Sequence, residues 1–393
     1  MSIECRNMAK RQQNFYKGRR KKRNFAIVPT VIVLLLFGVG IVLFYSTQKY
    51  AVISDDGVSV ELPVLGISSD KDGEEGNGAK EFEAADVTVE FLDADYSSVE
   101  AKAGKNVKPV RAIYIPYEDV NEESIPAYAS RLSSGNALLM DLKQKNGYLA
   151  YYSSTPVAYS YGLNMVGTDT KDRLKAVLTQ LKDDKIYLIA QISCCMDELL
   201  GAHSTEVCLR NEYGMYYYDE KGYWLDPYST IVRNYTVQLV QELWDMGFDE
   251  VLLQDVAHPT VADVENPDGT ITKPISYTRE MSTTPTPLGA VSGFAVYVAD
   301  QLADRESGKY LSAYLNSSTA LAKADENNGQ DGELFFKLFD RIYYETDKYA
   351  YTFNVQDVTP LCKAGNIKNR FVPVVINYLP DNTSWILVDQ SES

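Results

Sequence analysis

From residue 110 to residue 388, short strand-like apolar runs alternate with longer helical patterns. Eight runs are rich in β-branched, aromatic or leucine side chains, as expected for buried strands. These runs cover residues 110–115, 137–142, 186–192, 250–255, 310–314, 341–344, 371–376 and 385–388. Strands that alternate with helices predict a parallel sheet, and eight such units predict an α/β fold of the (β/α)8 TIM-barrel type.

The helical patterns between the strands have recognisable boundaries. Residues 171–182 carry leucines and a valine at helical spacing, and residues 229–246 and 287–304 each follow a proline-containing start signal. The sequence ends five residues after Val388, so we expect the last helix to be absent and residues 82–107 to cover its place. An open doubly wound sheet is the alternative, but the chain has no GxGxxG or Walker loop.

An apolar run of a different kind lies near the N-terminus. Residues 25–45 contain 21 residues and no charged side chain, enough to span about 30 Å of hydrocarbon at about 1.5 Å per residue. Basic residues precede this run and acidic residues follow it, which predicts a cytoplasmic N-terminus. A cleaved signal peptide is the alternative, but its apolar core is usually only about 7–15 residues long.

The sequence therefore predicts a single-pass cell-membrane protein with its large domain outside the cytoplasm. The predicted segments are a basic cytoplasmic tail (1–24), a transmembrane helix (25–45), an extracytoplasmic tether (46–81) and a barrel domain (82–393). The tether is predicted from residues 66–80, which are rich in Gly, Ser and acidic residues and cannot form a core.

Charge and composition narrow the partners. Residues 1–45 hold nine basic residues and one acidic residue, whereas the whole chain carries −16, so the remainder carries −24. Such an acidic domain repels phosphates, and no nucleic-acid partner is expected. The 29 tyrosines suit either a sugar-binding surface or an aromatic core.

Cysteine and histidine usage argues against a metal site. The chain has two histidines and no CxxC motif, so neither a structural zinc site nor any other cofactor is expected. Outside the predicted membrane helix, a disulfide could form among four cysteines, and spacing does not decide the pairing. These are Cys194, Cys195, Cys208 and Cys362.

Carboxylates at the ends of predicted strands are the candidate catalytic groups, because TIM barrels place reacting groups there. Asp255 ends the fourth strand, Asp141 ends the second, and Glu345 follows the sixth. Lys143 lies two residues after Asp141, on the same side if the strand continues. The structural alternatives are that Asp255 caps a turn or pairs with Lys143, that Asp141 is an ion-paired barrel residue, and that Glu345 begins an exposed helix.

Two long loops follow the third and fourth strands. The first, 194–224, contains Tyr217 and Trp224 among several aromatic residues. Such rings could stack on sugars at the barrel mouth or pack the loop onto itself. The second, 256–285, is proline-rich and of the length typical of lids or binding loops. Paired carboxylates with aromatic platforms are the requirements of glycoside hydrolysis.

Several segments, in this order and spacing, resemble a known bacterial family of glycoside-hydrolase-like TIM barrels, the DUF4015 group. The resemblance covers about 87–388 and is carried by VRAIYIPYEDV, NALLMDLKQKNGYLAYYSSTPVA, LKDDKIYLIAQISC, GYWLDPYSTIVRNY and MGFDEVLLQDVAHP. It implies a (β/α)8 fold and action on polysaccharide. The fourth-strand aspartate of the family corresponds to Asp255, and its second-strand Asp-x-Lys corresponds to Asp141 and Lys143.

The chain departs from this pattern at two places. Many members follow the fourth-strand aspartate with Tyr, Arg and an aromatic residue, where this chain has Val256, Ala257 and His258. Gln191 stands at the end of the third strand in place of a more usual Arg-led sequence. The missing arginines leave both the family's substrate contacts and its activity open for this chain.

Two functions follow from these observations. The first is a membrane-anchored hydrolase of a cell-surface or wall polysaccharide, with Asp255 and either Asp141 or Glu345 as its carboxylates. Its predicted substrate-binding residues are Lys143, Gln191, Trp224, Tyr217 and His258. The alternative is a catalytically inactive surface protein that binds glycan, or acts as a scaffold, through the same cleft.

Overall fold

The chain divides into two units, residues 1–85 and residues 86–393. A computed structural model describes residues 51–54, 57–60, 96, 99–100, 107–132, 136–220, 222–262, 264–265, 267, 271–272, 274–277, 285–345, 367–376 and 384–388. In the first unit, β1 (Ala51–Ser54) and β2 (Gly57–Val60) form an antiparallel pair. No helix of the described residues is long and apolar enough to cross a membrane. The predicted span, 25–45, lies outside those residues.

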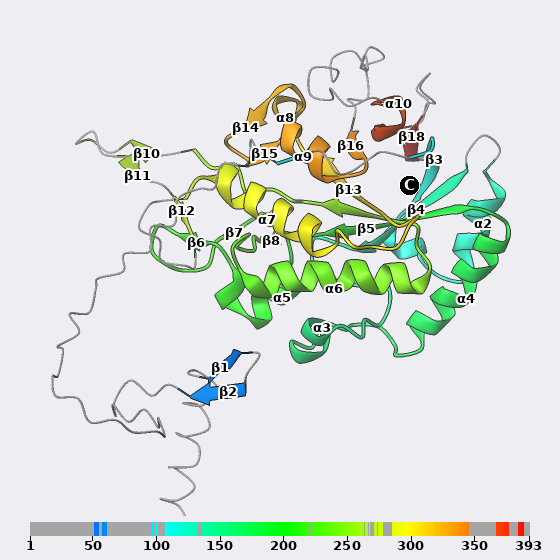
Figure 1. The fold of residues 1–393 in the computed structure, drawn as a ribbon, viewed down its shortest axis with the longest axis horizontal. Coiled ribbons are helices and arrows are strands. Elements are labelled where there is room, and N and C mark those ends of the chain that lie inside the picture. The colour runs from blue at the N-terminus through cyan, green and yellow to red at the C-terminus, as the bar shows by residue number, and fades with distance from the viewer. Residues whose placement is uncertain are drawn as a thin grey trace, which may run out of the picture. The chain divides into compact units, whose positions relative to one another are not determined.

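The second unit is built on a closed barrel of eight parallel strands (Figure 1). Its strands, in barrel order, are β3 (Arg111–Ile115), β4 (Ala137–Lys143), β5 (Tyr187–Ser193), β9 (Glu250–Gln254), β13 (Tyr310–Leu315), β16 (Ile342–Glu345), β17 (Phe371–Ile376) and β18 (Trp385–Val388). The last strand pairs with the first and closes the barrel. All eight predicted strands are therefore confirmed, and so is a barrel of the TIM type over an open sheet.

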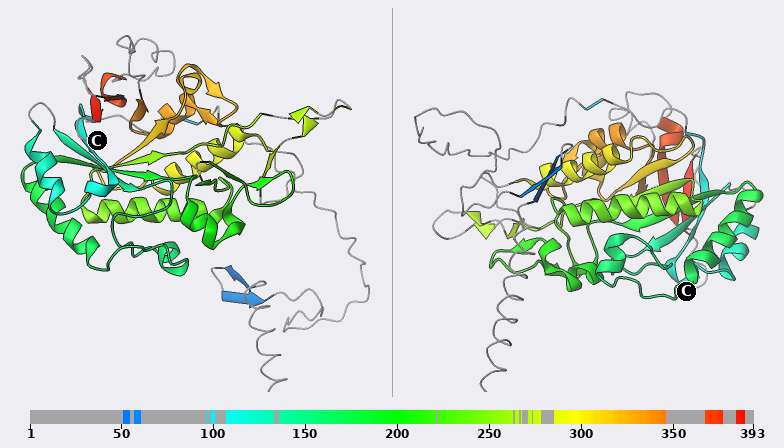
Figure 2. Two further views of the ribbon diagram at one scale, coloured as in Figure 1. Left: turned by 180° about the vertical axis from the view of Figure 1, so that it is seen from behind. Right: turned by 60° about the horizontal axis from the view of Figure 1, so that its bottom comes forward.

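Several helices pack against the outside of the barrel strands, and others, such as the short helix after β5, lie in the loops (Figures 1 and 2). They are α2 (Ser124–Ser130), α3 (Pro156–Ser160), α4 (Thr170–Asp183), α5 (Glu198–His203), α6 (Thr230–Met246), α7 (Pro287–Gln301), α8 (Ser318–Ala322), α9 (Gly332–Leu338) and α10 (Ile367–Arg370). The three helices predicted from the sequence correspond to α4, α6 and α7. The predicted apolar face of α4 is buried, and α6 ends at Gly247, whose positive φ of 120° suits glycine.

The core has two layers, as expected when strands bury both faces. The larger layer lies between the strands and the surrounding helices. A smaller cluster fills the barrel interior and includes Ala112, Leu139, Ile189 and Leu252. Side chains two residues further along β4 and β5 face the same interior, at the C-terminal end of the barrel.

The opposite end of the barrel is closed by a buried ion pair between Glu250 and Arg341. The hydroxyls of Tyr187, Ser312 and Tyr343 all donate to the Glu250 carboxylate, at 2.9, 2.6 and 2.8 Å. Glu250 begins β9, so this network lies at the N-terminal ends of the strands. Loss of either partner would leave the other charge buried without a counterion, so this network at the N-terminal end of the barrel has a structural role.

Candidate active site

Two of the predicted residues meet directly at the C-terminal end of the barrel. Asp141 on β4 is the register partner of Gln191 on β5, and Gln191 in turn lies opposite Leu252 of β9. Asp141 and Gln191 are 8% and 7% exposed. Both residues therefore lie near the C-terminal ends of their strands.

Asp141 sits in an environment that favours its protonated form. Its pKa is raised to about 6; burial is the largest cause, and the negative charges of Glu118 and Asp255 act in the same direction. Hydrogen bonds from Tyr114, whose hydroxyl donates to Oδ2 at 3.4 Å, and from Gln191 act in the opposite direction. A carboxyl group with a pKa near neutrality can both give and take a proton at physiological pH.

Asp255 follows β9 directly and has an unusual backbone. Its φ is +55°, in the left-handed region that non-glycine residues rarely adopt. Its carboxylate is 2% exposed, accepts a hydrogen bond from the Ser193 hydroxyl at 2.8 Å, and lies 3.3 Å from Lys145 Nζ. Backbone strain of about 1–3 kcal/mol is tolerated most often at functional sites, which marks Asp255 as a candidate on grounds independent of its charge.

Glu345 is the last residue of β16 and is exposed. The hydroxyl of Tyr314, on the neighbouring strand β13, donates to its Oε2 at 3.4 Å. Burial raises the pKa of Tyr314, and the charges of Glu345 and Asp255 add to that rise. Tyr314 is therefore close enough to feel both carboxylates, and Asp141 feels Asp255 in the same way. The three predicted carboxylates share one end of the barrel.

Lys143 does not lie on the same side as Asp141, contrary to the expectation for a regular strand. A register irregularity falls between Asp141 and Lys143 in the pairing of β4 with β5. Beyond it, Lys143 is 1% exposed, pairs with Asp197 at 2.8 Å and donates to the Ser193 carbonyl at 2.8 Å. The proposed Asp255–Lys143 pair is absent, because Lys143 serves Asp197 and the partly exposed Lys145 serves Asp255.

The aromatic loop after β5 is packed onto itself at the two predicted positions. Trp224 is 5% exposed, and its indole donates to Asp219 at 2.8 Å. Trp224 belongs to a small apolar cluster with Met196, Leu209, Ala257 and Ile275, and Tyr217 packs against the same cluster. Of the two alternatives for this loop, Trp224 follows the packing one. Other rings of this loop are exposed: Tyr213, Tyr216 and Tyr218.

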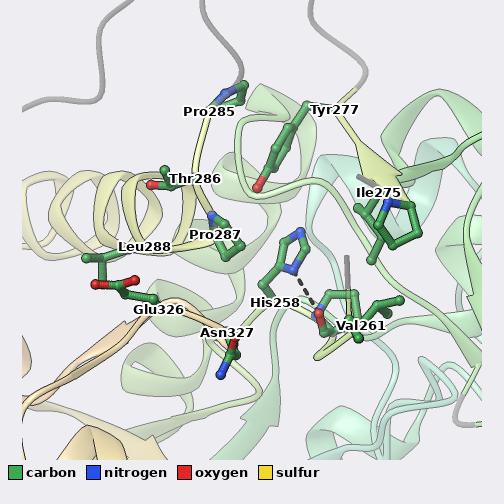
Figure 3. Close-up of a pocket in the computed structure, with 13 residues that line it drawn as sticks. His258, Val261, Ile275, Tyr277, Pro285, Thr286, Pro287, Leu288, Glu326 and Asn327 are labelled. Atoms are coloured by element: carbon green, nitrogen blue, oxygen red, sulfur yellow. Dashed lines mark hydrogen bonds between the residues drawn. The ribbon is translucent and has the colours of Figure 1, made fainter. Parts of the chain in front are cut away.

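His258 lies at a pocket between the β9–α7 connection and the turn after β14 (Ala324–Asp325). Its ring is 6% exposed, and burial lowers its pKa to about 4, so the ring is neutral at physiological pH. Figure 3 shows the ring between Ile275 and Pro287, below Tyr277. The cavity has a volume of about 510 Å³.

The cysteines that the structure describes are all buried. Cys194, Cys195 and Cys208 are free, buried thiols, so no disulfide joins them. Burial raises the pKa of Cys195 and of Cys208 to about 12, far from a reactive thiolate. Cys362 lies outside the described residues. Within those residues, no group of three or more His, Cys, Asp or Glu side chains is placed to hold a metal ion.

Four residues of the site were missed by the sequence reasoning. Tyr114 and Tyr314 each contact one of the carboxylates, and Ser193 and Lys145 hold Asp255. Three of these residues could have been found from the sequence, because Tyr114, Ser193 and Tyr314 lie at or near the ends of predicted strands. Lys145 is on a loop, and only the folded chain reveals its partner.

Comparison with known proteins gives one match at the level of sequence family. A family model described as "Putative glycosyl hydrolase domain" (DUF4015) matches residues 112–344. No curated protein matches the chain.

Solved structures resemble the chain at low identity. A hypothetical protein from Ruminiclostridium thermocellum is 22% identical, covering 51% of this chain and 96% of that one, with a TM-score of 0.42. Ega3 of Aspergillus fumigatus, solved with galactosamine, is 12% identical, covering 71% and 80%, with a TM-score of 0.38. A GH36 alpha-galactosidase from Geobacillus stearothermophilus, solved with raffinose, is 12% identical, covering 73% and 40%, with a TM-score of 0.47.

Proposed function

Because the chain belongs to the DUF4015 family of glycosyl hydrolase domains, we propose that it cleaves a glycosidic bond of a polysaccharide with Asp141 and Asp255. One observation carries the proposal. Two buried carboxylates share the C-terminal end of the barrel, and the charge of Asp255 helps to raise the pKa of Asp141 to about 6. Glycosidases work with such a pair, in which one carboxyl group is kept protonated beside another.

The two carboxyl groups have different surroundings, which suggests different roles. Asp141 has tyrosine and glutamine neighbours, and burial raises its pKa to about 6, so about a tenth of the group carries a proton at pH 7 and it acts as the general acid. Asp255 receives the Ser193 hydroxyl and lies beside Lys145, so it supplies the second carboxylate, as nucleophile or as base for water. Glu345, exposed at the end of β16, is the alternative partner of Asp255 in place of Asp141.

Residues 25–45 anchor the protein, and the barrel acts on cell-surface or wall glycan outside the cytoplasm. The support for this part is the 21-residue uncharged run with its basic N-terminal flank. Protease added to intact cells should degrade the barrel and leave the first residues protected. Degradation only after cell lysis would contradict the topology.

The test of the reaction uses the full chain in detergent and a panel of wall and capsular polysaccharides. Release of reducing ends is compared for the native protein, Asp255→Asn and Asp141→Asn. Asp172→Asn, the same change on the exposed surface of α4, is the matched control. We expect the control to cleave normally and each site variant to lose at least about 100-fold in rate, the usual scale for a general acid or base. Normal cleavage by both site variants would refute the assignment.

A non-catalytic glycan-binding function is the second candidate. It is favoured by the near-complete burial of Asp255, which is 2% exposed and already bonded to Ser193 and Lys145. The departures from the family pattern at Val256, Ala257 and Gln191 point the same way. Binding of a polysaccharide without release of reducing ends, unchanged in Asp255→Asn, would support this candidate over the hydrolase.

A further inference from the structure

The pocket beside His258 has the features of a built ligand site that the two carboxylates do not explain. It is bounded by the segment after β9, by the start of α7 and by the turn between β14 and β15 (Gln330–Asp331), which supplies Glu326 and Asn327 (Figure 3). Its volume of about 510 Å³ falls within the range of about 300–1,000 Å³ that is usual for small-molecule sites.

His258 is fixed in one orientation and one tautomer. Its backbone N–H donates to the Asn328 carbonyl at 2.8 Å, and its Nδ1 lies 2.9 Å from the Pro259 carbonyl. A carbonyl oxygen can only accept, so Nδ1 carries the proton and Nε2 presents a lone pair. The ring is 6% exposed, and Nε2 has no hydrogen-bond partner among the described residues.

An unmet buried acceptor destabilises a fold by about 1–3 kcal/mol unless a ligand supplies the missing donor. The neutral ring cannot itself attract an anion, since burial holds its pKa at about 4. Nε2 lies under Tyr277 and beside Ile275, on the pocket side of the ring rather than toward Pro259, and less than 1 Å² of the atom is accessible (Figure 3). The ligand therefore brings an O–H or N–H group to this point by displacing the side chains that cover the atom.

The walls specify the rest of the ligand. Pro259, Ile275, Pro287 and Leu288 form apolar surface, and the Tyr277 ring lies 5.8 Å from the His258 ring. Of the described residues that line the pocket, only Glu326 carries a formal charge, and it is negative. An apolar face combined with donating hydroxyls, and without negative charge, is the chemistry of a neutral sugar ring.

We propose that the His258 pocket is a subsite for one neutral sugar residue, a hydroxyl of which donates to His258 Nε2 while its apolar face packs on the proline and leucine wall. The inference rests on the proposed function in one respect, since the sugar belongs to the same glycan that reaches the carboxylates. The pocket and the carboxylates are linked through one short segment, because His258 comes only three residues after Asp255. Ala257, between them, is buried.

Two amide substitutions test the roles of the two ring nitrogens of His258 separately. In His258→Asn the amide nitrogen replaces Nδ1 and keeps the bond to Pro259, but the acceptor at Nε2 is lost. In His258→Gln an amide oxygen takes the position of Nε2 and keeps the acceptor. Leu288→Trp narrows the pocket without touching His258, and so it tests the site even if either histidine variant folds poorly.

Calorimetry with the full chain in detergent measures binding of tetrasaccharides of glucose, galactose and N-acetylglucosamine, with tetragalacturonate as the acidic probe. We expect at least one neutral probe to bind, His258→Asn and Leu288→Trp to weaken it by about 10-fold or more, and His258→Gln to weaken it by less than about 3-fold. Unchanged binding by both His258→Asn and Leu288→Trp would overturn the inference. So would binding of tetragalacturonate alone, or of no probe at all.

The same preparations distinguish this inference from the proposed reaction. If the neutral probe binds through His258 but no polysaccharide is cleaved, the subsite stands and the hydrolase reading fails. If polysaccharide is cleaved with the same KM by native protein, His258→Asn and Leu288→Trp, the hydrolase stands and the subsite fails.

Discussion

Replacing Lys143 by methionine tests whether this residue serves the fold or the substrate. The Lys143 and Asp197 side chains are 1% and 0% exposed, and Nζ lies 2.8 Å from Oδ2. Methionine preserves the apolar stem but removes the charge, which leaves the Asp197 carboxylate buried without a counterion. Removing one partner of a buried pair costs about 3–5 kcal/mol, a large part of a typical total stability of about 5–15 kcal/mol.

Changing both partners should cost less than changing one. In the double variant Lys143→Met, Asp197→Asn, no charge is left buried, and the asparagine oxygen still accepts the Leu200 N–H that Asp197 now receives at 2.7 Å. We therefore expect each single variant to lose about 3–5 kcal/mol and the double variant to recover more than half of that loss. Lys182→Met is the matched control, since Lys182 is 41% exposed in its pair with Asp249, and exposed pairs contribute about 0–1 kcal/mol.

Urea unfolding followed by tryptophan fluorescence is a suitable assay, because all three tryptophans are buried in the barrel domain. Glycan binding by the folded fraction is measured on the same samples. The structural role predicts large losses of stability with normal binding. A Lys143→Met protein of unchanged stability that no longer binds glycan would refute this reasoning and return Lys143 to the substrate site.

Three further changes give separate tests. Burial lowers the pKa of His258 from 6.5 to about 4, so the unfolded chain takes up a proton at a higher pH than the folded protein does. The free energy of unfolding therefore falls by about 3 kcal/mol as the pH falls from 6.5 toward 4. In urea-unfolding experiments over this pH range His258→Gln should make the free energy of unfolding less dependent on pH, and an unchanged pH dependence would contradict the assignment. The pKa of Asp141 is raised from 3.8 to about 6, so ionisation destabilises the fold as the pH rises through that interval. Asp141→Asn should therefore increase stability at neutral pH by about 2–3 kcal/mol while abolishing cleavage, and a lower Tm would count against it. Gly147→Ala should lower the free energy of unfolding by more than about 2 kcal/mol, because φ at this position is +86° and the new methyl group would lie 2.0 Å from Asp197 Oδ1. A Tm equal to that of the native protein would show instead that the loop moves to make room for the methyl group.

The strands were predictable because both of their faces are buried. A parallel barrel encloses each strand between the interior and the helices, so its sequence is a continuous apolar run bounded by polar residues. In β4, all seven residues are buried. The same burial made the ends of the runs informative, since a charged group such as Asp141 that closes an apolar run must have either a partner or a function.

The side on which each side chain lies was harder to predict. Strand alternation places Lys143 beside Asp141, and it is the register irregularity between them that sends Lys143 to Asp197. No sequence pattern marks that irregularity. The loop aromatics raise the same difficulty, because a stacking platform and a packed ring have the same composition. Trp224 is buried in an apolar cluster with Met196, Leu209 and other residues, and Asp219, five residues earlier, accepts its indole N–H.

The electrostatic surroundings of the buried acids separate structural groups from candidate catalytic ones. Glu250 and Asp197 are fully buried, and each has a buried cation as its partner, Arg341 or Lys143. Asp141 is nearly as buried, yet no described lysine or arginine lies within ion-pair distance of it, and the groups that act on it are a tyrosine, a glutamine and the carboxylates of Glu118 and Asp255. A fold gains nothing from leaving a carboxyl group there, since asparagine would fit the same hydrogen bonds at lower electrostatic cost. The electrostatic cost of burying Asp141 is offset only if the protein uses its proton in a reaction. This is the physical reason for proposing Asp141 as the general acid.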